Sequence, residues 1–370
     1  MTRARLCHWL LACAWGACAL GVSAQIRIGQ TVGVTGTVAA TVKESMLGAQ
    51  LVFDQVNAKG GVGGEKIEVT TLDDAFDVKK AEANARALVE DHGVLALFMS
   101  RGTPHTEAIN TVLEQHHVAL VGPSTGAMVL HQPLKRYIFN VRATYQREAE
   151  RAMAHLATMG AQRVALVHVD DSFGADALEG ARNGLKAAGL QPVAVLKFDR
   201  AKPDFAPLVA PLKTAQPQHV LLIGSGTAVV DGIRAFKTAG LGAQYLTLSN
   251  NASGGFIKLL GDLGHGVVVS QVMPASQGYT LVKDATQPAK ARGVDEVSPA
   301  MLEGFASARV LVEALRHAGP KPTRASLHSA LENLGRFDLG GLVLDYSPSD
   351  HTGLDFADLS IISANGKFRR

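Results

Sequence analysis

The sequence predicts an α/β fold built from two halves, each with a doubly wound parallel sheet. Short apolar segments alternate with amphipathic helical segments along nearly the whole chain, which is the order of repeated βαβ units. Aromatic residues make up only 5% of the 370 residues, and 47% of the residues are hydrophobic. This composition favours α/β layers and suffices for two cores. The alternation comes in two successive series, so we expect two similar halves.

The first series predicts one parallel sheet. Strands are expected at 26–33, 66–74, 94–100 and 118–123, and helices at 43–58, about 78–89 and 104–116. The helix at 43–58 carries apolar residues at helical spacing on one face, namely Met46, Ala49, Phe53 and Val56. The run VLALFMS (94–100) is continuously apolar, as expected for a parallel strand that is buried on both faces.

The second series predicts the other sheet. After a connecting strand at 136–145, strands are expected at 163–171, 192–199, 219–225, 245–250 and 266–274, and helices at 174–188, 204–214 and 227–239. Helices at 300–318 and 323–334 and a strand at 358–368 follow, and Asn365-Gly366 predicts a hairpin in that last segment. The region 275–300 is the least regular, and we expect it to loop over the surface.

The first 24 residues have the anatomy of a secretory signal peptide. Two arginines precede an apolar run at 10–22, and small residues at 22–24 form a cleavage site before Gln25. The run is shorter than the roughly 20 apolar residues that a membrane span needs. We therefore expect residues 1–24 to be removed. All three cysteines lie in this segment, so the mature chain would have no thiol, no disulfide and no cysteine metal site.

The charge and the motifs exclude several classes of function. Two of the 36 Lys and Arg residues lie in the signal segment, and the chain has 33 Asp and Glu, so the mature charge is close to +1. That balance predicts no nucleic-acid surface. The 13 histidines include no HExxH or similar ligand pair, and no nucleophile–base pair is evident. We therefore expect no metal, no cofactor and no enzyme.

The stretch NAKGGVGG (57–64) is rich in glycine but follows a helix and precedes a strand. Phosphate-binding loops have the opposite order, since the amino end of a helix must face the anion. Ligands of open α/β sheets bind beyond the carboxyl ends of the strands. We therefore expect these glycines to form a tight corner, with Gly60 ending the helix in the left-handed conformation.

Six polar loops follow the predicted strands at their carboxyl ends. They lie at 31–39, 99–106, 122–127, 168–174, 224–228 and 248–254. Their Gly, Ser, Thr and Asn residues can bind a carboxylate or carbonyl through hydroxyls and backbone N–H groups, and they can equally serve as helix caps. For any one loop both interpretations stay open. Together the six loops would converge on one rim, which predicts a ligand cleft.

Four segments resemble a known family, namely NAKGGVGGEKIEVTTLDD, VALVGPSTGA, RVALVHVDDSFG and PDFAPLVAPLK. They are similar to the periplasmic solute-binding proteins of ABC transporters of the leucine/isoleucine/valine-binding type, and the resemblance runs from about Ile26 to Phe368. It implies a type I periplasmic binding protein fold, with two Rossmann-like lobes joined by a three-strand hinge. The crossovers are expected near 140–145, 270–275 and 344–350. Lobe 1 would then comprise 25–141 and 275–345, and lobe 2 would comprise 142–274 and 346–370.

The resemblance also implies positions for a ligand site in lobe 1. Thr103, in the loop after the third strand, would offer a hydroxyl to a ligand carboxylate. Ser124, Thr125 and Gly126, after the fourth strand, would add backbone N–H groups and a hydroxyl.

In lobe 2 the resemblance implies an aromatic cover and an acid for an α-ammonium group. Phe173 supplies the ring. The expected acidic position has Asn250 and Asn251 instead, so Asp171 or its neighbour Asp170 is the alternative source of negative charge, although both can equally be helix caps. A buried ammonium without a carboxylate is poorly compensated, so the ligand class stays open between amino acid, amide and carboxylate.

The function implied is capture of a small polar ligand in the interlobe cleft for an ABC importer. We expect a periplasmic monomer whose partners are the ligand and an inner-membrane permease. The alternatives are a sensing module that signals to a membrane receptor and an exported enzyme. Arg142, near the first crossover, is interpreted as a surface salt-bridge residue, with a hinge residue or an anion partner as alternatives.

Overall fold

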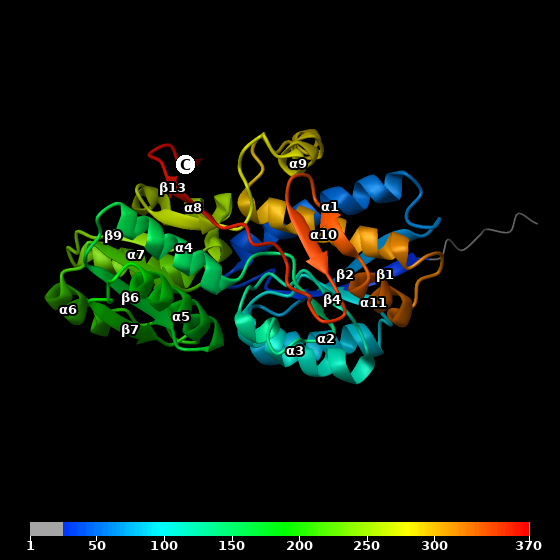
Figure 1. The fold of residues 1–370 in the computed structure, drawn as a ribbon, viewed down its shortest axis with the longest axis horizontal. Helices are drawn as coiled ribbons and strands as arrows, with labels where there is room; N and C mark the ends of the chain where they lie inside the picture. The colour runs from blue at the N-terminus through cyan, green and yellow to red at the C-terminus, as the bar shows by residue number, and fades with distance from the viewer. Residues whose placement is uncertain (1–24, 370) are drawn as a thin grey trace, which may run out of the picture.

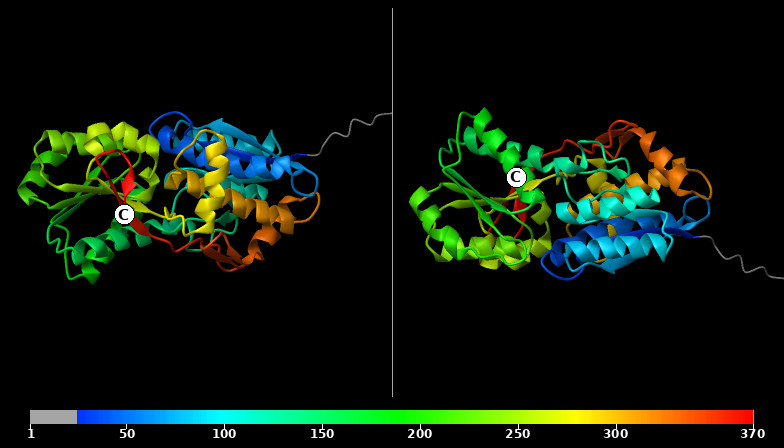
Figure 2. Two further views of the ribbon diagram at one scale, coloured as in Figure 1. Left: turned by 90° about the horizontal axis from the view of Figure 1, so that it is seen from above. Right: turned by 90° about the horizontal axis from the view of Figure 1, so that it is seen from below.

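The computed structural model describes residues 25–369, so the predicted signal peptide lies outside the described residues. Two lobes lie side by side along the long axis of the molecule (Figure 1). The amino-terminal sheet and the helices near residue 300 form the lobe at the right of Figure 1, and the C-terminus lies in the other lobe. Figure 2 shows the same division from above and from below. The α/β fold with two sheets of mainly parallel strands is therefore as the sequence predicts.

Lobe 1 contains a five-stranded parallel sheet. Its strand order is β2 (Lys66–Asp73), β1 (Gln25–Val32), β3 (Ala96–Phe98), β4 (Leu120–Val121) and β5 (Ile138–Phe139). Its helices are α1 (Ala39–Ala58), α2 (Val78–Glu90), α3 (Thr103–His116), η1 (Met128–Leu130), α9 (Thr280–Ala291), α10 (Pro299–His317) and α11 (Arg324–Glu332). A separate hairpin, β11 (Gly335–Asp338) and β12 (Val343–Tyr346), belongs to the same lobe.

Lobe 2 contains a seven-stranded sheet. Its strand order is β14 (Phe368–Arg369), β13 (Asp358–Ile362), β10 (Val268–Gln271), β9 (Gln244–Thr247), β8 (His219–Ile223), β6 (Val164–Val169) and β7 (Ala194–Phe198). Its helices are α4 (Tyr145–Thr158), α5 (Ser172–Ala187), α6 (Ala206–Ala215), α7 (Thr227–Thr238), η2 (Ser249–Asn251), α8 (Gly254–Leu260) and η3 (Gly261–Gly264). The strands from β10 to β7 are parallel, whereas β13 and β14 form the predicted antiparallel hairpin.

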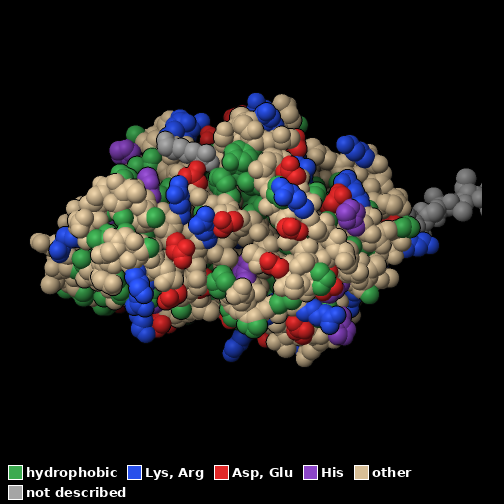
Figure 3. All heavy atoms as spheres, viewed as in Figure 1, with side chains coloured by type: hydrophobic (Ala, Val, Ile, Leu, Met, Phe, Trp, Pro, Cys, Tyr) green, Lys and Arg blue, Asp and Glu red, His purple; other side chains and the backbone are tan. Residues whose placement is uncertain are grey.

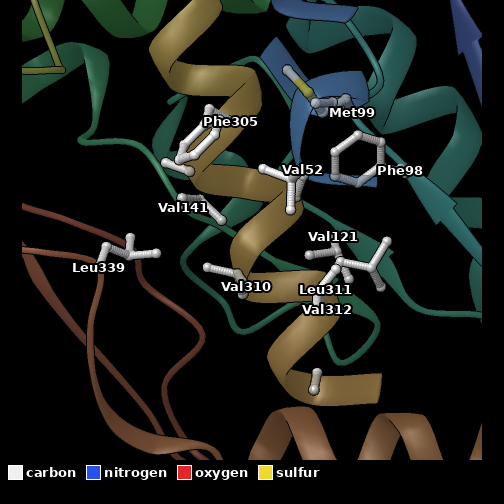
Figure 4. Packing of buried hydrophobic residues seen from close by; sticks show 14 of the residues in the cluster. Val52, Phe98, Met99, Val121, Val141, Phe305, Val310, Leu311, Val312 and Leu339 are labelled. Carbon is white, nitrogen blue, oxygen red and sulfur yellow. The ribbon is translucent and has the colours of Figure 1, made fainter. Parts of the chain in front are cut away.

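Helix α10 forms the centre of the lobe 1 core because its sequence is apolar on nearly every face. Figure 4 shows Phe305, Leu311 and Val312 of α10 among Val52 of α1 and Phe98 of β3. A helix that is hydrophobic all round must be covered on all sides. Helices α1, α9 and α11, the hairpin and the sheet supply that cover.

Two reciprocal glycines allow α1 and α10 to approach closely. A Cβ atom on Gly48 of α1 would lie 1.8 Å from the Met301 carbonyl oxygen, and one on Gly304 of α10 would lie 1.9 Å from the Ser45 carbonyl oxygen. No side chain fits at either position. The packing of α1 on α10 therefore depends on both glycines.

The chain crosses between the lobes three times. The crossings follow β5, β10 and β12. The first and third run together, because the Leu354 N–H donates to the Val141 carbonyl (2.9 Å) and the Asn140 N–H donates to the His351 carbonyl (3.0 Å). The lobes are thus joined by connections that lie side by side in part.

The packing shifts two of the lobe boundaries expected from the sequence. Val272 and Met273 already pack in the lobe 1 core, and Tyr346 and Leu354 still do. We therefore propose that lobe 1 comprises 25–141 and 272–354, and that lobe 2 comprises 142–271 and 355–369.

The prediction of an irregular loop at 275–300 is wrong for its central part. Helix α9 lies there and buries Leu281, Val282, Ala285 and Ala289 against lobe 1. Pro288 and the polar residues of this segment make the helical spacing of the apolar residues hard to recognise in the sequence. The helix nevertheless accommodates the proline near its carboxyl end. The β11–β12 hairpin, which turns through Gly340 and Gly341 with positive φ, was not predicted either.

The glycine-rich stretch forms a corner, as expected. Gly60 and Gly61 follow α1 with φ of 96° and 82°. A Cβ atom on Gly61 would lie 1.9 Å from the Glu65 carbonyl oxygen, and the Val62 and Glu65 backbones pair as an isolated bridge. The corner leads into the amino end of β2, away from the strand ends that approach lobe 2.

Charges of both signs are interspersed on the face of the molecule in Figure 3, and no broad region of that face carries a single sign. Among residues 25–369, no helix is long and apolar enough to cross a membrane.

Candidate ligand-binding site

The carboxyl ends of both parallel sheets face the boundary between the lobes, and polar turns meet across it. The hydroxyls of Thr41 in lobe 1 and Ser253 in lobe 2 lie 3.0 Å apart. The Thr227 N–H at the start of α7 donates to the Thr37 carbonyl over 3.2 Å. These contacts describe a closed arrangement of the two lobes.

Glu44 of α1 makes a further contact by capping a helix of the opposite lobe. Its carboxylate accepts from the N–H groups of Gly254 (3.1 Å) and Gly255 (2.6 Å) at the amino end of α8. A carboxylate at a helix amino terminus satisfies free N–H groups and interacts favourably with the helix dipole. Glu44 therefore stabilises the closed arrangement.

Glycines let the lobes come this close. A Cβ atom on Gly226, which has φ of 55°, would lie 1.9 Å from the Thr37 carbonyl oxygen of the other lobe. A Cβ atom on Gly255 would lie 2.9 Å from Ala40 Cβ. Side chains at these positions would hold the lobes apart.

The loops after β3 and β4 (99–106 and 122–127) form the wall of lobe 1 that faces lobe 2. This lobe 1 wall brings together the hydroxyls expected from the sequence. Thr103 at the start of α3 and Thr125 after β4 lie with their hydroxyl oxygens 2.7 Å apart, and both are fully buried. Ser124 is also buried. Gly102 makes the turn before α3 with φ of 91°, which a glycine adopts readily.

Arg101 is the residue at this wall that the sequence analysis missed. Its side chain is only 3% exposed. Nη1 donates to the Ser124 hydroxyl (2.9 Å), and Nη2 donates to the Asn250 backbone carbonyl of lobe 2. Burial lowers the pKa of the guanidinium, which nevertheless stays charged, because arginine is not deprotonated in proteins. The available signal was a basic residue in the loop 99–106, directly after a buried strand.

Gly126 lies where the loop after β4 contacts the first crossover. Its carbonyl accepts from the Tyr145 N–H (2.8 Å), and a Cβ atom there would lie 2.5 Å from the Ala143 carbonyl oxygen. Gly126 therefore permits a close backbone approach.

Asn250 and Asn251 are buried in the lobe 2 wall, where their side chains brace the loop. Asn250 Nδ2 donates to the Gly224 carbonyl and the Ser225 hydroxyl, each over 2.9 Å. Asn251 Nδ2 donates to the Gly224 carbonyl (3.1 Å), and its Oδ1 accepts from the Gly226 N–H (2.8 Å). The Asn250 group that faces lobe 1 is its backbone carbonyl.

Asp171 and Phe173 lie at the start of α5 in lobe 2. Asp171 caps this helix by accepting from the Gly174 N–H (3.0 Å), and it pairs with Arg200. The helix-cap interpretation therefore describes its contacts. The Phe173 ring is 2% exposed and packs 4.6 Å from the Tyr145 ring, centroid to centroid.

Arg142 is not a surface residue, so that prediction is wrong. It is 1% exposed and donates through Nη2 to the carboxylate of Glu148 and to the Ser249 hydroxyl (2.6 Å). Its Nη1 lies 3.9 Å from Glu303 of α10. The residue thus ties the first crossover to both lobes, which no feature of the local sequence indicated.

The closed boundary leaves little free space. A cavity of about 10 Å³ lies beside Arg101 and Ser124, bounded also by Ser45 and Met46, and it is large enough for one water at most. A larger groove of about 550 Å³ lies on lobe 1 between α1, α9 and α10, far from the polar turns. Entry of a solute between the lobes therefore requires them to open.

Comparisons with known proteins decide the family. A family model described as "Periplasmic binding protein" matches residues 25–359, which is most of the chain. The chain belongs to this periplasmic binding protein family. Members of the family are binding proteins and not enzymes. The described residues contain no group of three or more His, Cys, Asp and Glu side chains that could hold a metal ion.

Individual relatives of this periplasmic binding protein support the same family membership. The Leu/Ile/Val/Thr-binding protein of Salmonella typhimurium is 24% identical over 247 residues, which are 66% of this chain and 67% of that protein. The structure of a substrate-binding periplasmic protein from Ralstonia solanacearum has a TM-score of 0.85 at 30% identity, covering 93% of this chain and 99% of that one. A possible leucine/isoleucine/valine-binding protein from Rhodopirellula baltica has a TM-score of 0.88 at 25% identity, covering 95% and 98%. The resemblance found in the sequence is thereby confirmed.

Proposed function

We propose that this periplasmic binding protein captures a small polar solute, an amino acid, an amide or a carboxylate, between its lobes and delivers it to an ABC permease in the inner membrane. The observation that carries the proposal is the contact of polar turns from both lobes across one boundary, with Arg101 and Ser124 of lobe 1 meeting Asn250 of lobe 2. Such a boundary offers donors and acceptors from two sides, and only the closed form presents both to a ligand.

The residues proposed to line this site are those that lie at the boundary. They are Thr103, Ser124, Thr125, Gly126, Asp171, Phe173, Asn250 and Asn251, to which Arg101 is added. Within this set we propose direct ligand contact for the lobe 1 hydroxyls, and for Gly126, Asp171, Asn250 and Asn251 a role in bracing the loops that form the site.

The test combines native mass spectrometry with thermal unfolding. Protein purified from the periplasm is expected to carry a co-purified solute, and adding that solute to stripped protein should raise the unfolding temperature. The proposal fails when neither a co-purified solute nor any of a panel of amino acids, amides and carboxylic acids raises that temperature.

Export and oligomeric state belong to the same proposal. Cleavage after residue 24 would leave Gln25 as the first residue, which mass spectrometry of the exported protein measures directly. A monomer is expected, and light scattering during gel filtration tests it.

A further inference from the structure

Two buried carboxylates lie near the first crossover, and both face Arg142. Glu148 is fully buried, and its oxygens accept from Arg142, from the Ser249 N–H (3.0 Å) and from the Ser270 hydroxyl (2.5 Å). Glu303 is 4% exposed and lies 3.9 Å from Arg142 Nη1. Glu148 therefore neutralises Arg142 in direct contact, and Glu303 adds a second negative charge that acts on both Arg142 and Arg101.

Arg101 has no such partner. Among residues 25–369 it makes no ion pair, and its guanidinium donates only to a neutral hydroxyl and a neutral carbonyl. Glu303 acts on Arg101 through space alone. Burying a guanidinium without a carboxylate in contact is costly, and its fork of N–H donors is suited to bind a carboxylate with two parallel hydrogen bonds. The structure thus keeps a buried cation whose preferred partner is an anion.

Glu303 Oε1 accepts no hydrogen bond among the described residues, and its pairing with Arg142 spans 3.9 Å. Three further acids at the boundary each accept a hydrogen bond. Asp171 caps α5 and pairs with Arg200, Glu44 caps α8, and Glu107 accepts from the Ser172 hydroxyl. The loop at 248–254 offers two asparagines in place of an acid. An ammonium group would therefore have to compete with Arg142 for Glu303, and with an existing hydrogen-bond partner for each of the other three carboxylates.

We propose that the cleft takes an organic carboxylate without an ammonium group and that Arg101 is its direct ion partner. This inference rests on the proposed solute-binding function and names the ligand class. When the lobes open, Arg101 loses its contact with the Asn250 carbonyl, and the ligand carboxylate takes that place. The Ser124 hydroxyl accepts from Arg101, so its own proton is free to donate to the carboxylate.

The Thr103–Thr125 pair adds a second donor. One hydroxyl of the pair donates to the other over 2.7 Å, so the second hydroxyl proton remains available. A guanidinium with neighbouring hydroxyl donors satisfies an ionised carboxylate, whereas the uncharged NH₂ end of an amide would meet donors only. The site therefore distinguishes a carboxylate from an amide both by its charge and by its lack of hydrogen-bond donors.

The experiment measures binding of matched compounds to the exported, solute-free protein by calorimetry and thermal unfolding. The first set is 4-methylpentanoate, leucine and 4-methylpentanamide, and the second is 3-phenylpropanoate, phenylalanine and 3-phenylpropanamide. In at least one set the carboxylate is expected to bind at least about 10-fold more tightly than the matching amino acid and amide.

Variants test the role of Arg101. Arg101→Met is expected to weaken carboxylate binding at least about 30-fold, since it removes one partner of a buried charge pair. Arg101→Lys keeps the charge but loses the fork geometry, so its carboxylate affinity should lie between those of the wild type and Arg101→Met. The matched control is Arg234→Met, which removes an exposed arginine paired with Asp231 on α7 and should leave binding unchanged.

The outcomes separate this inference from the proposed function. An amino acid or amide that binds as tightly as the tightest-binding carboxylate of the two sets, or an Arg101→Met protein with undiminished carboxylate affinity, overturns the inference and leaves the solute-binding function standing. The ligand comparison uses the wild-type protein, so it is decisive even when a variant fails to fold. A wild-type protein that carries no co-purified solute and binds no amino acid, amide or carboxylic acid contradicts both this inference and the proposed function.

Discussion

Asp74 is a buried acid whose protonation is coupled to folding. It lies directly after β2, is 1% exposed, and accepts from the Thr31 hydroxyl (3.1 Å) and the Phe76 N–H (2.8 Å). Burial is the main cause that raises its pKa from 3.8 to about 6. The folded protein therefore binds this proton more tightly than the unfolded chain does, and stability is lost as the pH rises from about 4 to about 6.

Asp74→Asn should flatten this part of the pH profile. The asparagine keeps an acceptor for Phe76 and does not ionise, so the fall in unfolding free energy between pH 4 and pH 6.5 should shrink by at most about 3 kcal/mol. Chemical unfolding of both proteins at several pH values measures this change in unfolding free energy. Asp176, whose pKa burial also raises to about 6, leaves a residual slope. A variant with the wild-type profile would contradict the assignment.

At the residue scale, the sequence predicted the positions of the hydroxyls at the lobe boundary better than those of the buried charges. Thr103, Ser124 and Thr125 follow predicted strands, so their place at the strand ends follows from the fold class. Arg101 and Arg142 have no local pattern that marks them as buried. Their burial arises when residues from the other lobe cover them, and such long-range contacts leave no periodic signal.

Among the elements, the crossing of α1 on α10 depends most directly on residue size. Gly48 faces the Met301 carbonyl, and Gly304 faces the Ser45 carbonyl. Backbone atoms cannot move aside as a flexible side chain can, so any Cβ atom here must push the helices apart.

Gly48→Ala should therefore destabilise the protein, by about 3 kcal/mol. This sign is opposite to the gain of roughly 1 kcal/mol that alanine gives over glycine in a helix interior. Urea unfolding monitored by circular dichroism measures the change. The matched control is Gly242→Ala, where a Cβ atom would meet nothing within 4 Å. Equal midpoints for the two variants would contradict the packing argument.

The elements with a clear hydrophobic period were predicted, and those without one were missed. Strands such as β6 and β8 are apolar except for one histidine each, and α10 has a long apolar sequence. Helix α9 was missed because it contains Pro288, and the β11–β12 hairpin was missed because its strands are short and partly exposed. Tertiary contact with lobe 1, and not local propensity, stabilises both elements.

For the whole molecule, the closed arrangement depends on how closely α8 approaches α1. A Cβ atom on Gly255 would lie 2.9 Å from Ala40 Cβ and 3.1 Å from the Ala40 carbonyl oxygen of the other lobe. On the adjacent Gly254, the nearest atom would be Glu44 Oε1 at 3.5 Å, which is ordinary contact.

Gly255→Ala should weaken solute binding about 10-fold without lowering the unfolding temperature of the solute-free protein, because it disfavours only the closed form. Calorimetry with the bound solute measures the affinity. Gly254→Ala is the matched control and should bind like the wild type. An unchanged affinity in Gly255→Ala would show that closure contributes nothing to binding.

The central claim is that the two lobes close on a solute, and the distance between them tests it most directly. Residues 25–370 contain no cysteine, so in protein that begins at Gln25, Lys80→Cys on α2 and Lys186→Cys on α5 place one spin label on each lobe at exposed positions. We predict that a saturating solute shifts the distance distribution measured by electron spin resonance to one shorter and narrower population. A solute that binds stoichiometrically and leaves this distribution unchanged would contradict the account.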